Sequence, residues 1–152
     1  MNYVSTLKFP KEEQGLNSAL NDLFKEWVNE AKNKILPENY SADDLVFEGF
    51  YPYYQSQSKK ILFIGRESLS ISGYNYIDTL YQHYKDHHIG NTHINQHVMH
   101  RRLLKIAYGL INGCQSYGSI PDADLIADNF GTTNGISFSF MNISKFSCKS
   151  PA

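Results

Sequence analysis

KKILFIGRES, residues 59–68, is the stretch of sequence that decides the fold class of this chain. Residues 61–64 are all apolar and stand between a pair of lysines and Gly65. A short apolar run without alternation, bounded by polar residues and glycine, is typical of a strand covered on both faces, as in a parallel sheet. The run ISFSFMN, residues 136–142, follows Gly135 and predicts a second buried strand.

Helices are predicted around these two strands. Apolar residues recur at three- and four-residue steps, which indicates helices over 14–36, 74–88 and 95–112 and a short helix over 121–128. Strands joined by helical crossovers pair in parallel with a right-handed connection. We therefore expect one α/β domain over residues 1–152, with a central, mostly parallel sheet flanked by helices.

Two strands alone do not make a stable sheet with both faces covered. Either other short segments add strands, or the chain is only the N-terminal part of a longer fold. The aromatic segment LVFEGFYPYY, residues 45–54, reads as an ordered loop or a short extended piece.

Bulk composition excludes several classes of protein. With 41% hydrophobic and 19% charged residues and a formal net charge of -1, the chain is globular and carries no overall bias toward a polyanion. Its two cysteines, Cys114 and Cys148, have no metal-ligand spacing and indicate reduced thiols rather than a disulfide framework. No apolar run is long enough to span a bilayer, and the first residues lack a signal-peptide layout. We expect a cytoplasmic protein without a membrane segment or a cofactor.

Polar residues follow both predicted strands. The first strand runs into Gly65-Arg66-Glu67-Ser68, and the second ends at Asn142 and continues into Ser144 and Lys145. Ligands of open α/β sheets bind beyond the carboxyl ends of the strands, so neighbouring strands would bring Glu67 and Asn142 to one crevice. A carboxylate there orients water, and a carboxamide reads an amide-like base edge.

Basic and hydroxyl side chains at the same place are candidate phosphate contacts, namely Arg66, Ser144 and Lys145. In the alternative interpretation, Glu67 pairs with Arg66 or caps the following segment, and Asn142 caps the end of its strand.

The segments ILFIGRESLSISGYNY (61–76) and GISFSFMNIS (135–144) resemble the uracil-DNA glycosylase superfamily. In that family a strand ends in a Gly-Gln-Asp-Pro-Tyr-His or Gly-Glu-Ala-Pro-Gly turn, and a later strand reads Gly-x-Leu-Leu-Leu-Asn. The resemblance covers roughly residues 47–147. It implies that Glu67 positions water, that Asn142 reads a flipped base, and that Gly65, Arg66 and Ser68 form the first turn.

The resemblance also carries expectations about substrate and extent. It implies hydrolysis of a base–sugar N-glycosidic bond in DNA, single-stranded or uracil-containing, with Tyr74 or Tyr76 stacking on the base. Ser68 stands where the family has proline, and the third family motif, a His-Pro-Ser-like loop, has no counterpart. We therefore expect the N-terminal part of a uracil-DNA glycosylase-like fold. The alternatives are a non-catalytic nucleic-acid or nucleotide-binding module, and an interaction protein that uses EGFYPYY (48–54) as its contact surface.

Six histidines lie between residues 83 and 100, and His83/His87 and His97/His100 are each about one helical turn apart. Two such pairs are a possible zinc site, but no H-E-x-x-H arrangement or cysteine accompanies them. We expect a solvated, histidine-rich hairpin without a metal. The basic residues Arg101, Arg102 and Lys105 either contact a nucleic-acid backbone or form the solvated face of an amphipathic helix.

Overall fold

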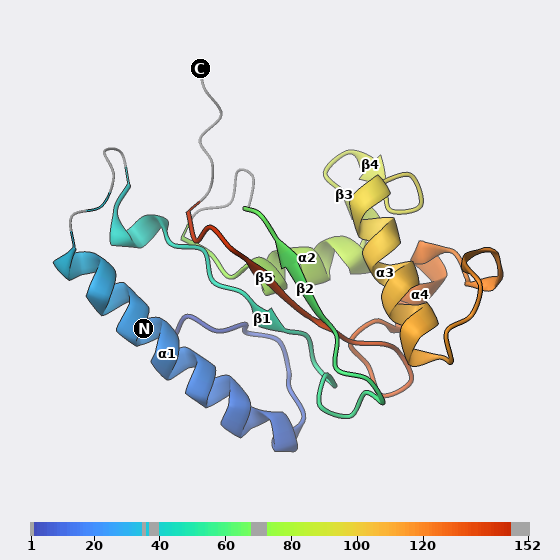
Figure 1. Cartoon of the computed structure of the whole chain (residues 1–152), viewed down its shortest axis with the longest axis horizontal. Helices are drawn as coiled ribbons and strands as arrows, with labels where there is room; N and C mark the ends of the chain where they lie inside the picture. Colours follow the sequence, from blue (N-terminus) through green and yellow to red (C-terminus); the bar gives the residue numbers. More distant parts are fainter. Residues whose placement is uncertain (1, 35, 37–39, 68–72, 147–152) are drawn as a thin grey trace.

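The computed structural model describes residues 2–34, 36, 40–67 and 73–146 and shows a mixed α/β architecture (Figure 1). Its helices are α1 (Gln14–Asn33), α2 (Tyr76–Lys85), α3 (Val98–Ile111) and α4 (Ala123–Asn129). A three-stranded sheet contains β1 (Gly49–Phe50), β2 (Leu62–Gly65) and β5 (Ser139–Asn142). The strands β3 (His88–Ile89) and β4 (Thr92–His93) form a separate small hairpin.

The order of the sheet is β1-β5-β2, so the two predicted strands are neighbours. They pair in parallel, with Leu62 opposite Ser139 and Gly65 opposite Asn142. This confirms the predicted pairing. The small sheet is mixed, because β1 joins β5 antiparallel over two residues, whereas β2 and β5 pair in parallel over four. β1 comes from the aromatic segment 45–54, in which only Gly49 and Phe50 form a regular strand.

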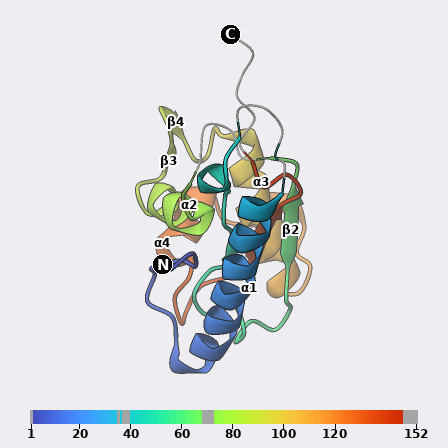
Figure 2. The same cartoon turned by 90° about the vertical axis from the view of Figure 1, so that its left-hand side faces the viewer.

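The helices divide into two groups around the sheet. The residues of α2, α3 and α4 form the larger hydrophobic core with Phe138 and Phe140 from the chain around β5. Phe24 and Val28 of α1 pack with Val4, Leu45 and Phe47 in a second cluster. Figure 2 shows α1 toward the viewer, with α2 and β2 on opposite sides of it.

The prediction that β2 is covered on both faces is wrong. Leu62 and Ile64 expose 49% and 60% of their surface, whereas Phe63 packs against the larger core. The larger core covers only the Phe63 face of β2 and leaves Leu62 and Ile64, on the other face, exposed. An unbroken apolar run does not reveal which of its alternating side chains find a partner.

The predicted helices are all present, with shorter bounds than the apolar patterns indicate. Side chains at their beginnings explain two of these bounds. Asn75 accepts a hydrogen bond from the backbone N–H of Ile77 at 2.9 Å and caps α2. His97 accepts one from the N–H of His100 and caps α3. No helix in the described part of the chain is long and apolar enough to cross a membrane.

Candidate functional site at the ends of β2 and β5

The backbones of β2 and β5 stay paired beyond the strands themselves. Ile143 donates to the carbonyl of Gly65 at 3.0 Å, and Ser144 donates to that of Arg66 at 2.9 Å. These bonds hold the turn after β2 beside the chain after β5. The two predicted site segments, far apart in sequence, therefore lie side by side.

Glu67 and Asn142 line one cavity of about 440 Å³ at this place. Such a volume is within the range of small-ligand pockets. The cavity is lined by Phe63, Ile64, Gly65, Arg66, Glu67, Met99, Leu103, Phe140 and Asn142. Its volume alone does not set it apart, since a hollow of about 460 Å³ lies beside Tyr74. What distinguishes it is a carboxylate and a carboxamide at the carboxyl ends of parallel strands, among apolar walls.

Asn142 is almost fully buried, with 1% of its surface exposed. Its backbone N–H donates to Oε1 of Glu48 at 3.1 Å. Its Oδ1 lies 2.4 Å from the point where a Cβ on Gly65 would stand, so the carboxamide packs directly against the Gly65 backbone. Its Nδ2 makes no hydrogen bond to any residue that the structure describes. Leaving a buried donor unpaired costs about 1–3 kcal/mol.

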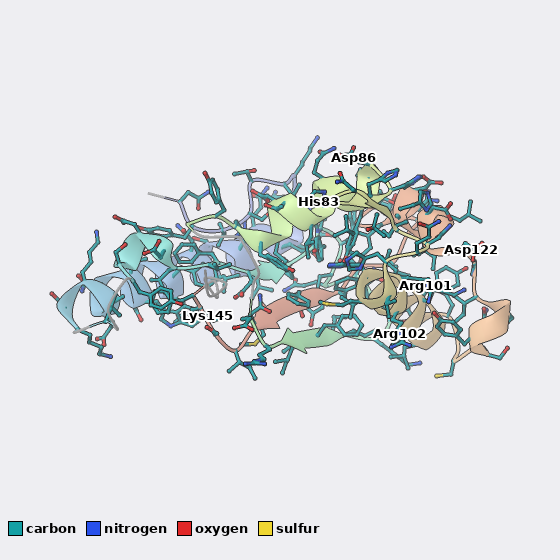
Figure 3. All side chains as sticks on the ribbon, turned by 90° about the horizontal axis from the view of Figure 1, so that it is seen from above. His83, Asp86, Arg101, Arg102, Asp122 and Lys145 are labelled. Atoms are coloured by element: carbon teal, nitrogen blue, oxygen red, sulfur yellow. The ribbon has the colours of Figure 1, made fainter. Side chains whose placement is uncertain are left out.

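Glu48 is a buried carboxylate that sequence reasoning did not identify as a site residue. Only 2% of its surface is exposed, and its Oε2 accepts from Nζ of Lys145 at 2.5 Å. Burial raises its pKa, although Lys145 and the backbone hydrogen bond from Asn142 act to lower it. Lys145, labelled in Figure 3, also stands over the Trp27 ring, 5.4 Å from its centroid. The available signal was the charge itself, because an acid between Phe47 and Gly49 in an aromatic run needs a partner once buried.

Glu67 lies at the rim of the cavity with 23% of its side chain exposed, beside Arg66 with 91% exposed. Nε of Arg66 and Oε1 of Glu67 are 3.8 Å apart. The interpretation in which these neighbours pair therefore has direct support. An exposed pair at this distance is worth at most about 1 kcal/mol, so it leaves the Glu67 carboxylate available to a ligand.

The remaining predicted site residues lie outside this cavity lining. Tyr74 is exposed beside a different hollow. Tyr76 is buried behind the wall and stacks on Phe140, with ring centroids 5.4 Å apart. The aromatic rings that line the cavity belong instead to Phe63 and Phe140.

Ser144 and Lys145, the predicted phosphate contacts, both have partners within the chain. The hydroxyl of Ser144 donates to the carbonyl of Phe146 at 3.0 Å, and Lys145 pairs with Glu48. Ser68 lies outside the described residues.

The histidine-rich segment makes several separate contacts. His87 pairs with Asp128 at 2.8 Å, and the rings of His88 and His93 meet edge to face. His100 is buried and its Nδ1 lies 3.0 Å from the hydroxyl of Tyr84. Burial lowers the pKa of His100 to about 4, with smaller effects from His97 and His83. Among the described residues, no group of three or more histidine, cysteine, aspartate or glutamate side chains is placed to hold a metal ion.

Two of the three basic residues on α3, Arg101 and Lys105, are tied to their own chain; Figure 3 labels Arg101 and Arg102 on this helix. Arg101 donates from Nη1 to the carbonyl of Asn95 at 2.9 Å. Lys105 is buried, lies 3.8 Å from Asp122, and stands over the ring of Tyr117. These contacts place Arg101 and Lys105 in the packing of α3 rather than on a freely solvated face.

Comparisons of the chain with protein-family models, with curated proteins and with solved structures found no match.

Proposed function

We propose that this chain is a uracil-DNA glycosylase-like protein that holds a nucleobase in the cavity at the ends of β2 and β5 and hydrolyses its bond to the sugar. One observation carries the proposal: Glu67 and Asn142, from distant segments, line the same cavity. The sequence resemblance assigns the same two residues to water positioning and base reading. The uracil-DNA glycosylase-like fold is part of this proposal.

The cavity supplies the groups that the reaction needs. Phe63 and Phe140 offer apolar faces to a planar ring, and Asn142 offers a carboxamide to its edge. The oxygen of a water molecule attacks C1′ of the sugar while the glycosidic C–N bond breaks. The Glu67 carboxylate accepts the proton of that water, and the base departs with the electron pair of the broken bond.

A second function, base or nucleotide binding without hydrolysis, is favoured by the Arg66–Glu67 pair. A guanidinium 3.8 Å from the carboxylate competes with water for it. In that case the cavity retains a ligand but does not activate water.

Release of uracil from labelled single-stranded DNA tests the proposal. We expect the wild-type chain to release base and Glu67→Gln to lower the rate by about 10²- to 10⁴-fold, because positioned general acid–base groups contribute that much. Asn142→Asp is expected to weaken base binding. Glu26→Gln, at an exposed position of α1, is the matched control and is expected to keep the wild-type rate.

Binding of the same oligonucleotide, measured by fluorescence anisotropy, separates the two functions. Binding without release supports the non-catalytic function. Release that is unchanged in Glu67→Gln removes Glu67 from the mechanism, and the absence of both release and binding overturns the proposal.

A further inference from the structure

The Glu48–Lys145 pair sits directly behind the cavity wall, outside the residues that line the cavity itself. Glu48 precedes β1, Lys145 follows β5, and Asn142 ends β5 between them and Gly65 of β2. Glu48 is the more deeply buried partner, and Nζ of Lys145 lies 2.5 Å from its Oε2. Burying a carboxylate is costly unless an opposite charge and hydrogen bonds compensate it, and Glu48 has both Lys145 and the backbone N–H of Asn142 as partners.

The Asn142 carboxamide has an identifiable direction between these groups. The central strand β5 has Gly65 of β2 on one side and, on the other, Glu48, whose Oε1 accepts the backbone N–H of Asn142. Oδ1 of Asn142 lies against Gly65. Its Nδ2, the donor of the carboxamide, therefore lies away from Gly65, toward the Glu48 side, and makes no hydrogen bond to a described residue.

When Glu48 is ionised, the favourable orientation of the carboxamide has Nδ2 toward Glu48 and Oδ1 toward Gly65. A carboxylate only accepts hydrogen bonds, so a rotated carboxamide would place its own oxygen against two acceptor oxygens. The ammonium of Lys145, in contact with Oε2, favours the charged carboxylate, whereas burial, the larger effect, raises the pKa of Glu48. The other titratable group facing Glu48 is Tyr76 of α2, whose pKa is raised by burial and by Glu48.

We propose that Glu48 is a positioning residue that fixes the Asn142 carboxamide with its oxygen toward the Gly65 side of the cavity. A ligand at that side must then donate a hydrogen bond. A ring with a lactam or imide N–H, such as uracil, fits this polarity, whereas a ring nitrogen with a lone pair, as in cytosine, meets an acceptor. The inference has two halves. The ligand half, the preference for a ring that donates a hydrogen bond, rests on the proposed function. The positioning half, the orientation of Asn142 by Glu48, does not.

The side-chain NH₂ resonances of Asn142 test the positioning half without any ligand. They are assigned in ¹⁵N-labelled protein by their loss in Asn142→Asp. We expect these resonances to shift as Glu48 titrates, and to become insensitive to pH over that range in Glu48→Gln. Lys145→Met is expected to move the midpoint to higher pH, because it removes the charge that favours the ionised carboxylate. Glu13→Gln is the matched control, since Glu13 is also a buried carboxylate, with its oxygens on the backbone N–H groups of Tyr53 and Gln55.

Affinities for free uracil and free cytosine test the ligand half. We expect the wild-type chain and Glu13→Gln to prefer uracil by about tenfold or more, the discrimination typical of a base edge read by hydrogen bonds. In Glu48→Gln the preference is expected to fall below about threefold, because a neutral carboxamide accepts either direction of Asn142.

The outcomes separate the two proposals. If wild-type protein binds neither base, the proposed function fails and the resonances alone decide the role of Glu48. Resonances in Glu48→Gln that titrate as in the wild type overturn the positioning role. A uracil preference that survives in Glu48→Gln overturns the ligand half.

Discussion

Among the described residues, two glutamates are buried, and they have different surroundings. Glu13 is 1% exposed and accepts the backbone N–H groups of Tyr53 and Gln55 at 2.9 and 2.7 Å. These bonds fix a turn in which Tyr53 has a φ of 64°, a left-handed conformation that a non-glycine residue rarely adopts. Glu48 instead accepts hydrogen bonds from the ammonium of Lys145 and the backbone N–H of Asn142 behind the cavity wall. The first carboxylate shapes the backbone, whereas the second acts on a side chain of the candidate site.

His100 is expected to make the stability of the fold depend on pH. Its pKa is lowered from 6.5 to about 4 by burial. Between these values the unfolded chain binds more protons than the folded chain, so the free energy of unfolding falls as pH falls through this window. The full shift corresponds to about 3 kcal/mol.

Urea unfolding at several values between pH 7 and pH 4 checks this expectation. His100→Gln retains an acceptor for Tyr84 and is expected to show a flatter profile over the same range. His88→Gln, at an exposed position, is expected to keep the wild-type profile. Equal slopes in the wild-type chain and His100→Gln would assign the pH dependence to other groups.

Gly65→Ala is expected to disturb the candidate site at its centre. The new Cβ would stand 2.4 Å from Oδ1 of Asn142 and 2.9 Å from Cζ of Phe140, closer than normal contacts. Overpacking of this kind costs about 1–3 kcal/mol of unfolding free energy, and relief requires that Asn142 move. Thermal unfolding and the side-chain resonances of Asn142 measure the two effects.

Gly15→Ala is the control for this substitution, because a Cβ there meets nothing within 4 Å. In α1 it is expected to stabilise the chain by about 0.5–1 kcal/mol. A stable Gly65→Ala protein with unmoved Asn142 resonances would contradict the close packing of these two residues.

At the level of elements, β2 has one face that matters for stability and one that does not. Phe140, opposite Phe63 on β5, is buried in the larger core, whereas Ile64 is mostly exposed. Ile64→Thr is therefore expected to change the unfolding free energy by no more than about 0.5 kcal/mol. Phe140→Ala is expected to cost about 3–5 kcal/mol. Comparable losses in urea unfolding would show that Ile64 is covered after all.

The periodic elements were predictable from the sequence because a helix records its buried stripe locally. The stripe of Phe24 and Val28 in α1 is an example. The parallel pairing of β2 with β5 followed from the helices between them, and it brought Glu67 and Asn142 together as expected. These are features in which chain order and local pattern decide the geometry.

Features that depend on contacts between distant segments were not predictable. The two residues of β1 carry no strand pattern and pair only because β5 offers an edge. From the sequence, Lys145 is predicted to contact phosphate, but in the structure its ammonium lies 2.5 Å from the Glu48 carboxylate. Tyr76 reads as a stacking residue for a base, yet it stacks on Phe140 inside the core. In each case the partner residue lies far away in the sequence, so no local sequence pattern indicates the contact.

Across the whole molecule, the helices leave one border of the sheet uncovered. The larger core lies toward α2, α3 and α4, and the second cluster lies toward α1. Between α1 and the sheet is an apolar hollow of about 360 Å³ whose lining includes Leu20, Leu62 and Met141. Exposed apolar residues therefore gather where β2 forms the border of the sheet.

This border is expected to make the chain associate with itself at high concentration. The carbonyls of Ile61 and Gly65 accept bonds from the β5 side, so by alternation the backbone groups of Leu62 and Ile64 point away from β5. Unpaired backbone groups beside exposed apolar side chains form a template for pairing with another strand. Lys59, Lys60 and Arg66 flank the strand and oppose pairing with an identical copy, so the association is expected to be weak and to strengthen with salt.

Sedimentation velocity over a range from micromolar to millimolar protein measures this association. Ile64→Lys adds another charge to the border and is expected to keep the chain monomeric across the range. Leu125→Lys removes a similarly exposed leucine from α4 and is expected to associate as the wild type does. A wild-type chain that stays monomeric at high salt, or an Ile64→Lys chain that associates equally, would show that β2 is not the contact. Because Ile64 also lines the Glu67–Asn142 cavity, loss of base binding in the same variant would show that the border and the candidate site are one continuous surface.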